Sequence, residues 1–177
     1  ELYKNLKLMP SKSKPEPEHA WHEAMRNCQL MDNFTPEKTQ IALTSYYGLV
    51  SFVDELIGKI LTAVKSLELE DSTQIIYTSD HGDNIGERHL WGKSNFYEES
   101  IGVPLIIAGP NVPIGKVCQT PVSLVDIYPT ILETARLSVE PQKPGRSLIK
   151  IANEPNENDR IIFAEYHAMG SKSGGFM

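Results

Sequence analysis

An acidic side chain and an imidazole, those of Asp80 and His81, directly follow a short apolar run at positions 75–77. Such a run is typical of a strand buried in a parallel sheet, and ligands of open α/β sheets bind at the carboxyl ends of the strands. Burying both polar groups is unfavourable unless a partner compensates them. A divalent cation is such a partner, because a carboxylate supplies a hard oxygen and a neutral imidazole a nitrogen. Gly82 then lets the chain turn away without crowding the predicted metal site.

A long amphipathic helix is predicted before this strand. Thr35 is a suitable N-cap, Pro36 fits the first helical position, and Glu37 lies near the positive end of the helix dipole. From there to about Ser66, apolar residues recur at steps of three and four. Residues 68–72 form a polar link to the strand. A helix followed by a strand is half of an α/β unit, so we expect an α/β domain.

The rest of the chain supplies shorter elements and surface connections. The other predicted elements are a helix at 20–31, a short helix near Tyr97, a strand at 103–108, a helix opened by Ser123 or Asp126 with Pro129 in its first turn, and a strand at 161–166. Residues 84–100 are expected to form a loop over the strand ends, where functional residues concentrate. Residues 1–18 and 139–159 are rich in proline and charge, so we expect the first to form a surface connection and the second to lie mostly on the surface.

The composition limits the classes of partner. With 177 residues, 40% of them hydrophobic and 23% charged, the chain suits one globular domain or part of a larger one. The net charge of -6 argues against nucleic acid, and no apolar run approaches the length that crosses a bilayer. The sequence has two cysteines, Cys28 and Cys118, which favours a reducing compartment, although one disulfide between them stays an alternative. Because Glu1 is not an initiating residue, the localisation stays open between cytoplasm and periplasm.

Several motifs occur in the order and spacing of a known family. They are Thr-Ser-Asp-His-Gly at 78–82, Gly-Glu at 86–87, Leu-Trp-Gly-Lys at 90–93 and Val-Pro-Leu at 103–105, with further landmarks at 46–54, 121–130 and 145–148. The sequence resembles the sulfatases of the alkaline-phosphatase-like superfamily, most nearly the choline-sulfatase-like bacterial branch. The resemblance covers residues 35–166. It implies an α/β fold with a mostly parallel sheet and helices on both faces, of which this chain is a part.

The resemblance also implies roles for three residues. Asp80 and His81 correspond to two metal ligands, and Lys93 to the lysine that contacts the transferred sulfate, so Lys93 is the expected catalytic and substrate-binding residue. A cation and an ammonium group close to the sulfuryl oxygens would stabilise the charge of the transition state. The resemblance suggests calcium. Manganese and zinc stay open, because calcium prefers shells made only of oxygen.

The motif departs from the family pattern beside these residues. Many relatives have histidine where this chain has Arg88, and His89 follows it. Arg88 could bind an anion bidentately, and His89 is either a shifted substitute or an ordinary loop residue. His167, after the third predicted strand, is another candidate for substrate binding. Asp83 and Glu87 are either loop ligands for a metal or solvated acids.

The nucleophile motif of the family is absent from this sequence. Sulfatases carry a Cys- or Ser-x-Pro-x-Arg type motif, in which the Cys or Ser becomes formylglycine, and two further metal-binding aspartates. The segments around Cys28 and Cys118 do not fit it. We therefore expect the later portion of a catalytic domain, with an irregular lead-in at 1–34, an α/β core at 35–166 and the start of a further segment at 167–177. The chain alone is expected to be inactive.

The sequence leaves three functions in competition. The leading hypothesis is a fragment of a sulfatase that hydrolyses the sulfate ester of a small molecule or glycan, with formylglycine located outside this chain. A phosphonate monoester or phosphodiester hydrolase of the same superfamily is the alternative, and a noncatalytic α/β binding module is the second. No membrane or nucleic-acid partner is expected. Homo-oligomerisation stays an alternative, since missing strands would leave an exposed sheet edge.

Overall fold

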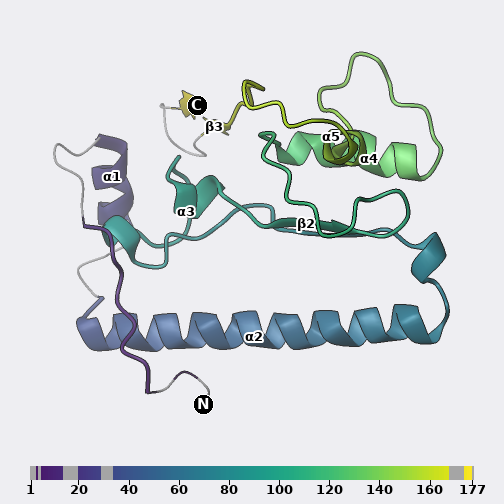
Figure 1. Ribbon diagram of the computed structural model, residues 1–177. Coiled ribbons are helices and arrows are strands. Elements are labelled where there is room, and N and C mark those ends of the chain that lie inside the picture. Colours follow the sequence, from purple (N-terminus) through teal and green to yellow (C-terminus); the bar gives the residue numbers. More distant parts are fainter. Residues whose placement is uncertain (1–2, 4, 14–19, 29–33, 168–173, 177) are drawn as a thin grey trace. The chain divides into compact units, whose positions relative to one another are not determined.

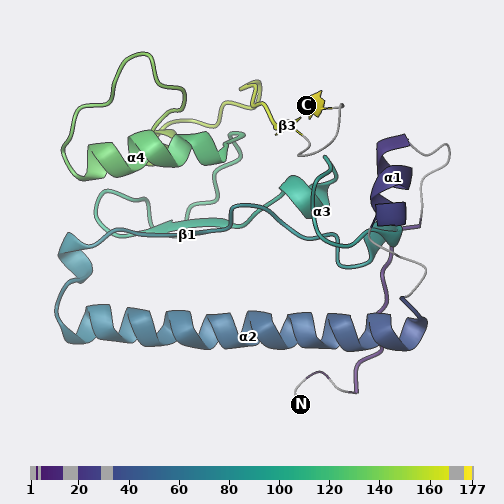
Figure 2. The same ribbon diagram turned by 180° about the vertical axis from the view of Figure 1, so that it is seen from behind.

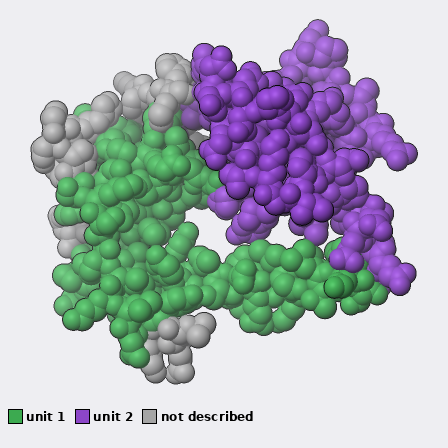
Figure 3. All heavy atoms as spheres, viewed as in Figure 1, with its two compact units in different colours: residues 1–66, 81–103 green, residues 67–80, 104–177 purple. Residues whose placement is uncertain are grey.

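The computed structural model describes residues 3, 5–13, 20–28, 34–167 and 174–176 (Figure 1). Its elements are α1 (Ala20–Cys28), α2 (Pro36–Ser66), η2 (Glu70–Ser72), β1 (Ile75–Thr78), η3 (Glu87–His89), α3 (Glu98–Ile101), β2 (Leu105–Ala108), η4 (Leu124–Asp126), α4 (Ile127–Thr134), α5 (Leu148–Asn153), β3 (Glu165–His167) and β4 (Gly174–Phe176). They form two compact units (Figure 3). Unit 1 comprises Glu1–Ser66 and His81–Val103, and unit 2 comprises Leu67–Asp80 and Pro104–Met177.

Unit 1 is built on α2, which runs unbroken for 31 residues (Figure 2). Its start is capped as predicted, because the backbone N–H of Lys38 donates to Thr35 Oγ1 at 3.4 Å. Thr39 and Leu43 are its buried residues. Gln40 holds the N-terminal segment against the helix: its amide donates to the Leu6 carbonyl and accepts from the Leu8 N–H. The predicted helix from Thr35 to about Ser66 is therefore confirmed.

Unit 2 contains the pair of strands that precedes and follows the loop of the candidate site. β1 and β2 pair antiparallel, with Ile75 opposite Ala108 and Thr78 opposite Leu105. Later in the sequence, α4 and α5 share a small core in which Leu148 and Ile151 are buried. β3 and β4 form a second antiparallel pair.

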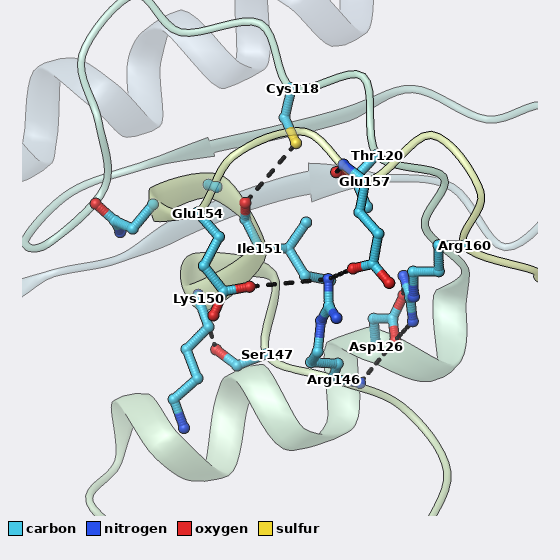
Figure 4. Close-up of polar contacts among 12 residues, drawn as sticks. Cys118, Thr120, Asp126, Arg146, Ser147, Lys150, Ile151, Glu154, Glu157 and Arg160 are labelled. Atoms are coloured by element: carbon cyan, nitrogen blue, oxygen red, sulfur yellow. Dashed lines mark hydrogen bonds and ion pairs between the residues drawn. The ribbon is translucent and has the colours of Figure 1, made fainter.

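A buried ion pair ties three segments of unit 2 together (Figure 4). Asp126 is fully buried, and its two carboxylate oxygens accept hydrogen bonds from the Arg160 guanidinium at 2.7 and 2.9 Å. The backbone N–H groups of Ser123 and Arg146 donate to the same carboxylate at 2.9 and 2.8 Å. All the strong acceptor positions of this acid are thus used, as a buried charge requires.

The structure corrects two sequence-based expectations. β1 and β2 are antiparallel, not parallel, because the chain leaves the end of β1, makes only a loop with short helical turns and returns at the same end, with no crossover helix. The strand predicted at 161–166 is reduced to Glu165–His167, and Ile161 and Phe163 are exposed. Residues 139–159 lie mostly on the surface, as expected, and they also contain α5 with its buried Leu148 and Ile151.

The other predicted elements are present. The strands at 75 and 105, the short helix after Tyr97 and the helix with Pro129 in its first turn occur as β1, β2, α3 and α4. Across the part of the chain that the structure describes, every helix is too short or too polar to cross a membrane.

Candidate active site

Asp80 lies two residues beyond β1, in a bend and not in a helix, where the sequence predicts it. Its side chain is exposed, and Ser79 Oγ donates to Asp80 Oδ1 at 3.4 Å. Its role as a metal ligand stays a prediction.

His81 is half-buried, and both of its ring nitrogens have neighbours. Nδ1 lies 2.8 Å from the carbonyl oxygen of Gly82. A carbonyl only accepts, so the hydrogen-bond pattern assigns the proton to Nδ1 and leaves the lone pair on Nε2. The ammonium group of Lys93 contacts Nε2. The structure thus brings together two of the three residues that the family resemblance selects, although they are twelve positions apart.

The loop that carries Lys93 is held by hydrogen bonds to its backbone. The carbonyl of Gly92 accepts from the backbone and side-chain N–H groups of the fully buried Asn84, at 2.7 and 2.6 Å. Asp83 Oδ1 accepts from the backbone N–H groups of Ile85 at 2.8 Å and Gly92 at 3.1 Å. Asp83 therefore organises the loop through its backbone, which is neither of the roles that the sequence left open for it.

Gly82 permits a close backbone approach beside His81. Its N–H donates to the carbonyl of Ser100 at 2.8 Å. A Cβ at this position would lie 2.1 Å from the carbonyl oxygen of Glu99, far inside van der Waals contact. Glycine is therefore required here by the backbone of the segment at 99–102, whereas the predicted reason, room beside a metal site, stays a prediction.

Replacing Gly82 with alanine is expected to lower the free energy of unfolding by about 1–3 kcal/mol, because backbone atoms must move apart. Urea unfolding of the full-length protein would measure it. Gly58 is the matched control. It lies inside α2, where an added Cβ would meet no atom within 4 Å, so Gly58→Ala should raise stability slightly. An equal stability of Gly82→Ala and the wild type would show that the close approach carries no constraint.

Arg88 is drawn into an ion pair in unit 1. Its guanidinium contacts the carboxylate of Glu99 and lies 4.1 Å from the centroid of the Tyr97 ring. The ammonium group of Lys12 contacts the same carboxylate. Burial alone would raise the pKa of Glu99, but hydrogen bonds from Lys12 and Arg88 outweigh it, so this pKa is lowered. Arg88 would therefore have to exchange Glu99 for a substrate anion, and its role in substrate binding stays a prediction.

His89 and Glu87 take different places from Arg88. The His89 ring is exposed, has no hydrogen bond or ion pair among the described residues, and lines a cavity. The Glu87 carboxylate accepts from the backbone N–H groups of Ser11 at 2.9 Å and Lys12 at 2.6 Å, so it is a structural acid. His167 ends β3, and its side chain lies outside what the structure describes. The substrate-binding roles of His89 and His167 stay predictions.

The described residues offer a metal only part of a shell. Within the ranges that the structure describes, three or more His, Cys, Asp or Glu side chains nowhere gather in a way that could hold an ion. The chemistry of Asp80 and His81 nevertheless suits two positions of such a shell. In particular, the Nδ1–H of His81 is held by a carbonyl, the arrangement that directs Nε2 of a ligating histidine at a metal.

Sequence reasoning missed two residues that shape this loop. Glu99 neutralises Arg88 and Lys12, and Asn84 fixes the Gly92 carbonyl. Neither residue belongs to a periodic pattern or to a cluster of side chains that could bind a metal or a substrate. Their partners come from other turns of the chain, so no local signal marks them.

The family model for sulfatases matches residues 16–137 of the chain. The chain belongs to the sulfatase family. A choline-sulfatase from Rhizobium meliloti (strain 1021) is 35% identical to this sulfatase chain over 151 residues, which are 83% of the chain and 29% of that enzyme. The family that the motifs predict is thus confirmed, and the chain spans less than a third of this curated relative.

Two solved structures share the fold of the sulfatase chain. Phosphonate monoester hydrolase SpPMH from Silicibacter pomeroyi has a TM-score of 0.76 and 27% identity, covering 89% of this chain and 34% of that one. A protein solved in complex with its substrate D-glucosamine-2-N,6-O-disulfate has a TM-score of 0.71 and 27% identity, covering 89% and 35%. The predicted alkaline-phosphatase-like α/β fold is confirmed at the level of the family, and this chain is a part of it.

Proposed function

We propose that this chain is the later portion of a sulfatase catalytic domain, and that the full-length protein hydrolyses sulfate esters with a divalent metal and a formylglycine nucleophile outside this chain. The observation that carries the proposal is the contact between Lys93 and His81. It sets an ammonium group beside the Asp-His motif that the family uses for metal binding. The natural substrate would be a sulfated small molecule or a glycan, in line with the choline-sulfatase relative and the disulfated glucosamine of the solved complex.

Three residues of this chain would have separate roles in the reaction. Lys93 would place a positive charge and hydrogen-bond donors near the sulfuryl oxygens, where negative charge accumulates in the transition state. Asp80 and His81 would supply two of about six ligand positions, Asp80 through oxygen and His81 through Nε2. When bound, a divalent cation supplies Lewis-acid stabilisation of the same oxygens. Calcium is the candidate from the family, with manganese and zinc as alternatives.

Lys93 and a metal would compete for one lone pair. The Nε2 of His81 accepts from the Lys93 ammonium, so ligation through this nitrogen requires Lys93 to release it. The exposed Lys93 side chain has room to do so. Once Lys93 had released His81, its ammonium group would be free to bind the substrate.

The full-length protein, assayed with an aryl sulfate and an aryl phosphonate, is expected to favour the sulfate. Chelation with EDTA should abolish turnover, and calcium, manganese or zinc should restore it, the most effective ion identifying the cofactor. The 177-residue chain alone should show no turnover, because no Cys- or Ser-x-Pro-x-Arg nucleophile motif occurs in it.

Each competing function has its own outcome in this assay. Faster hydrolysis of the phosphonate would favour the phosphonate hydrolase, to which the chain is structurally similar. No turnover of either ester by the full-length protein with any of the three ions would leave the noncatalytic module. Turnover by the 177-residue chain alone would mean that it contains an unrecognised nucleophile.

A further inference from the structure

Lys93 lies in its loop between two residues with left-handed backbone angles. Gly92 and Ser94 have φ of 69° and 81°, and both are half-buried, whereas the Lys93 side chain is exposed. Glycine adopts such an angle freely, but a residue with a Cβ rarely does. The angle at Ser94 therefore persists only where other contacts hold the backbone in place.

Trp21 of α1 supplies such a contact. Its indole N–H donates to the Ser94 carbonyl at 2.8 Å, although the two residues are 73 positions apart in the sequence. The indole nitrogen is a donor only, which suits a carbonyl partner. The bond holds the peptide group that joins Ser94 to Asn95, directly after the strained angle and one residue beyond Lys93.

The backbone before Lys93 is fixed by other residues. The Gly92 carbonyl, in the peptide group that joins Gly92 to Lys93, accepts from the backbone and side-chain N–H groups of Asn84. The Gly92 N–H donates to Asp83 Oδ1. The bonds before Lys93 thus come from its own loop, whereas the bond after it comes from a separate helix. Hydrogen bonds on both sides restrict where the lysine side chain can begin.

Helix α1 has further contacts that keep Trp21 in place. Met25, one helical turn after Trp21, is buried with 6% of its surface exposed. The ring of His22 lies against the ring of Tyr97 with centroids 4.8 Å apart, and His22 Nδ1 is 3.3 Å from the Tyr97 hydroxyl. Tyr97 comes three residues after Ser94, so α1 contacts the segment that follows Lys93 at two points. A helix fixed in this way can hold the Ser94 carbonyl.

We propose that Trp21 is a positioning residue for the reaction: its indole N–H holds the Ser94 carbonyl and thereby keeps the Lys93 ammonium group where charge develops on the substrate. The proposal rests on the proposed function and adds to it a residue that belongs to none of the motifs selecting Asp80, His81 and Lys93. A displacement of about 1 Å at a reacting group can cost up to a hundredfold in rate. Loss of this one hydrogen bond should therefore slow the reaction while the fold stays intact.

The test replaces each of the two tryptophans of the chain by phenylalanine in the full-length protein. Trp21 is half-buried, and Trp21→Phe keeps an aromatic ring but removes the N–H that binds Ser94. Trp91→Phe is the matched control, because the Trp91 ring stacks on Phe34 and its N–H makes no hydrogen bond among the residues described. With an aryl sulfate, Trp21→Phe should lower kcat about tenfold and change KM less than about twofold. Trp91→Phe should leave both constants within about twofold of the wild type.

A double-mutant cycle determines whether Trp21 acts through Lys93. In the Lys93→Ala background, Trp21→Phe should change kcat by less than about twofold, because the ammonium group that it would misplace is gone. A further loss of about tenfold in that background would overturn the proposal, since Trp21 would then act on another part of the site. A kcat of Trp21→Phe equal to that of Trp91→Phe would overturn it as well.

Hydrogen exchange separates this proposal from the proposed function. Mass spectrometry of the full-length protein should show faster amide exchange across residues 92–97 in Trp21→Phe than in the wild type and Trp91→Phe, with equal exchange in α2. If this difference holds while the wild type hydrolyses no sulfate ester, the proposed function fails and the hold of Trp21 on the Lys93 loop stands. Equal exchange in all three proteins, together with hydrolysis by the wild type, would overturn the role of Trp21 and leave the sulfatase intact.

Discussion

Lys93→Ala is expected to lower the kcat for sulfate ester hydrolysis by the full-length protein about a hundredfold, the usual loss for one preorganised electrostatic contact. The loop that holds Lys93 is fixed by Asn84 and Asp83, so its backbone should survive the substitution. The effect should therefore fall on kcat more than on KM, because the interaction strengthens in the transition state. Steady-state kinetics with an aryl sulfate would measure it.

Lys59→Ala is the matched control for this experiment. Lys59 is an exposed lysine of α2 in the same unit, and its ammonium group pairs with Glu55, one helical turn earlier, at 2.7 Å. Such exposed pairs contribute little, so activity and stability should stay close to the wild type. Kinetics of Lys93→Ala that match those of Lys59→Ala would remove Lys93 from the active site.

Arg160→Leu is expected to lower the free energy of unfolding by about 3–5 kcal/mol, because it leaves the buried Asp126 carboxylate without its counter-charge. Arg146→Leu is the matched control. The Arg146 backbone N–H that binds Asp126 survives this change, and its partly exposed side chain pairs with Glu157 at 2.7 Å. The control should cost less than about 1 kcal/mol. Urea unfolding compares the two variants, and equal losses would contradict a dominant role for the buried pair.

The same ion pair predicts how stability depends on pH. Burial alone would raise the pKa of Asp126, but hydrogen bonds from Arg160 and from the Ser123 and Arg146 N–H groups outweigh it, so this pKa is lowered in the folded state. A lowered pKa stabilises the fold above the unfolded value of about 4, and that contribution is lost as pH falls through the folded value. Without Arg160 the burial that raises this pKa is less compensated, so the variant takes up a proton on Asp126 at higher pH than the wild type. The stability difference between wild type and Arg160→Leu, measured by urea unfolding, should therefore be largest near pH 7 and shrink as the pH falls through the acid range.

Local patterns predict the elements that depend on local interactions. The cap at Thr35 and the helical period give α2 its bounds, and the apolar run before Asp80 locates β1. The direction of β2 is not predictable in this way, since it depends on the path of the loop between the strands. Helix α5 is not predictable from the sequence pattern, because its six residues contain little more than one helical period of apolar side chains.

In the candidate site, too, the sequence predicts the residues that lie in local motifs and not the contacts between separate segments. The motifs select Asp80, His81 and Lys93, and the structure joins the last two. The sequence predicts that Arg88 binds a substrate anion. In the structure its guanidinium instead contacts the carboxylate of Glu99, eleven positions away, and no sequence pattern indicates this pairing. The cavity of about 440 Å³ in unit 1 has no motif at all, because three separate stretches of chain line it: residues 9–13, the start of α2 with Phe34 before it, and the turn at 86–91.

The segment at 9–13 is joined to the turn at 86–90 mainly through its backbone groups. Glu87 binds the N–H groups of Ser11 and Lys12, and Arg88 binds the Lys12 carbonyl, so these bonds do not depend on which side chains the segment carries. The segment is also distant in sequence from Lys93. Side chains at 9–13 can consequently be exchanged without loss of these bonds, so the surface that the segment presents can change while the turn that precedes Lys93 keeps its place.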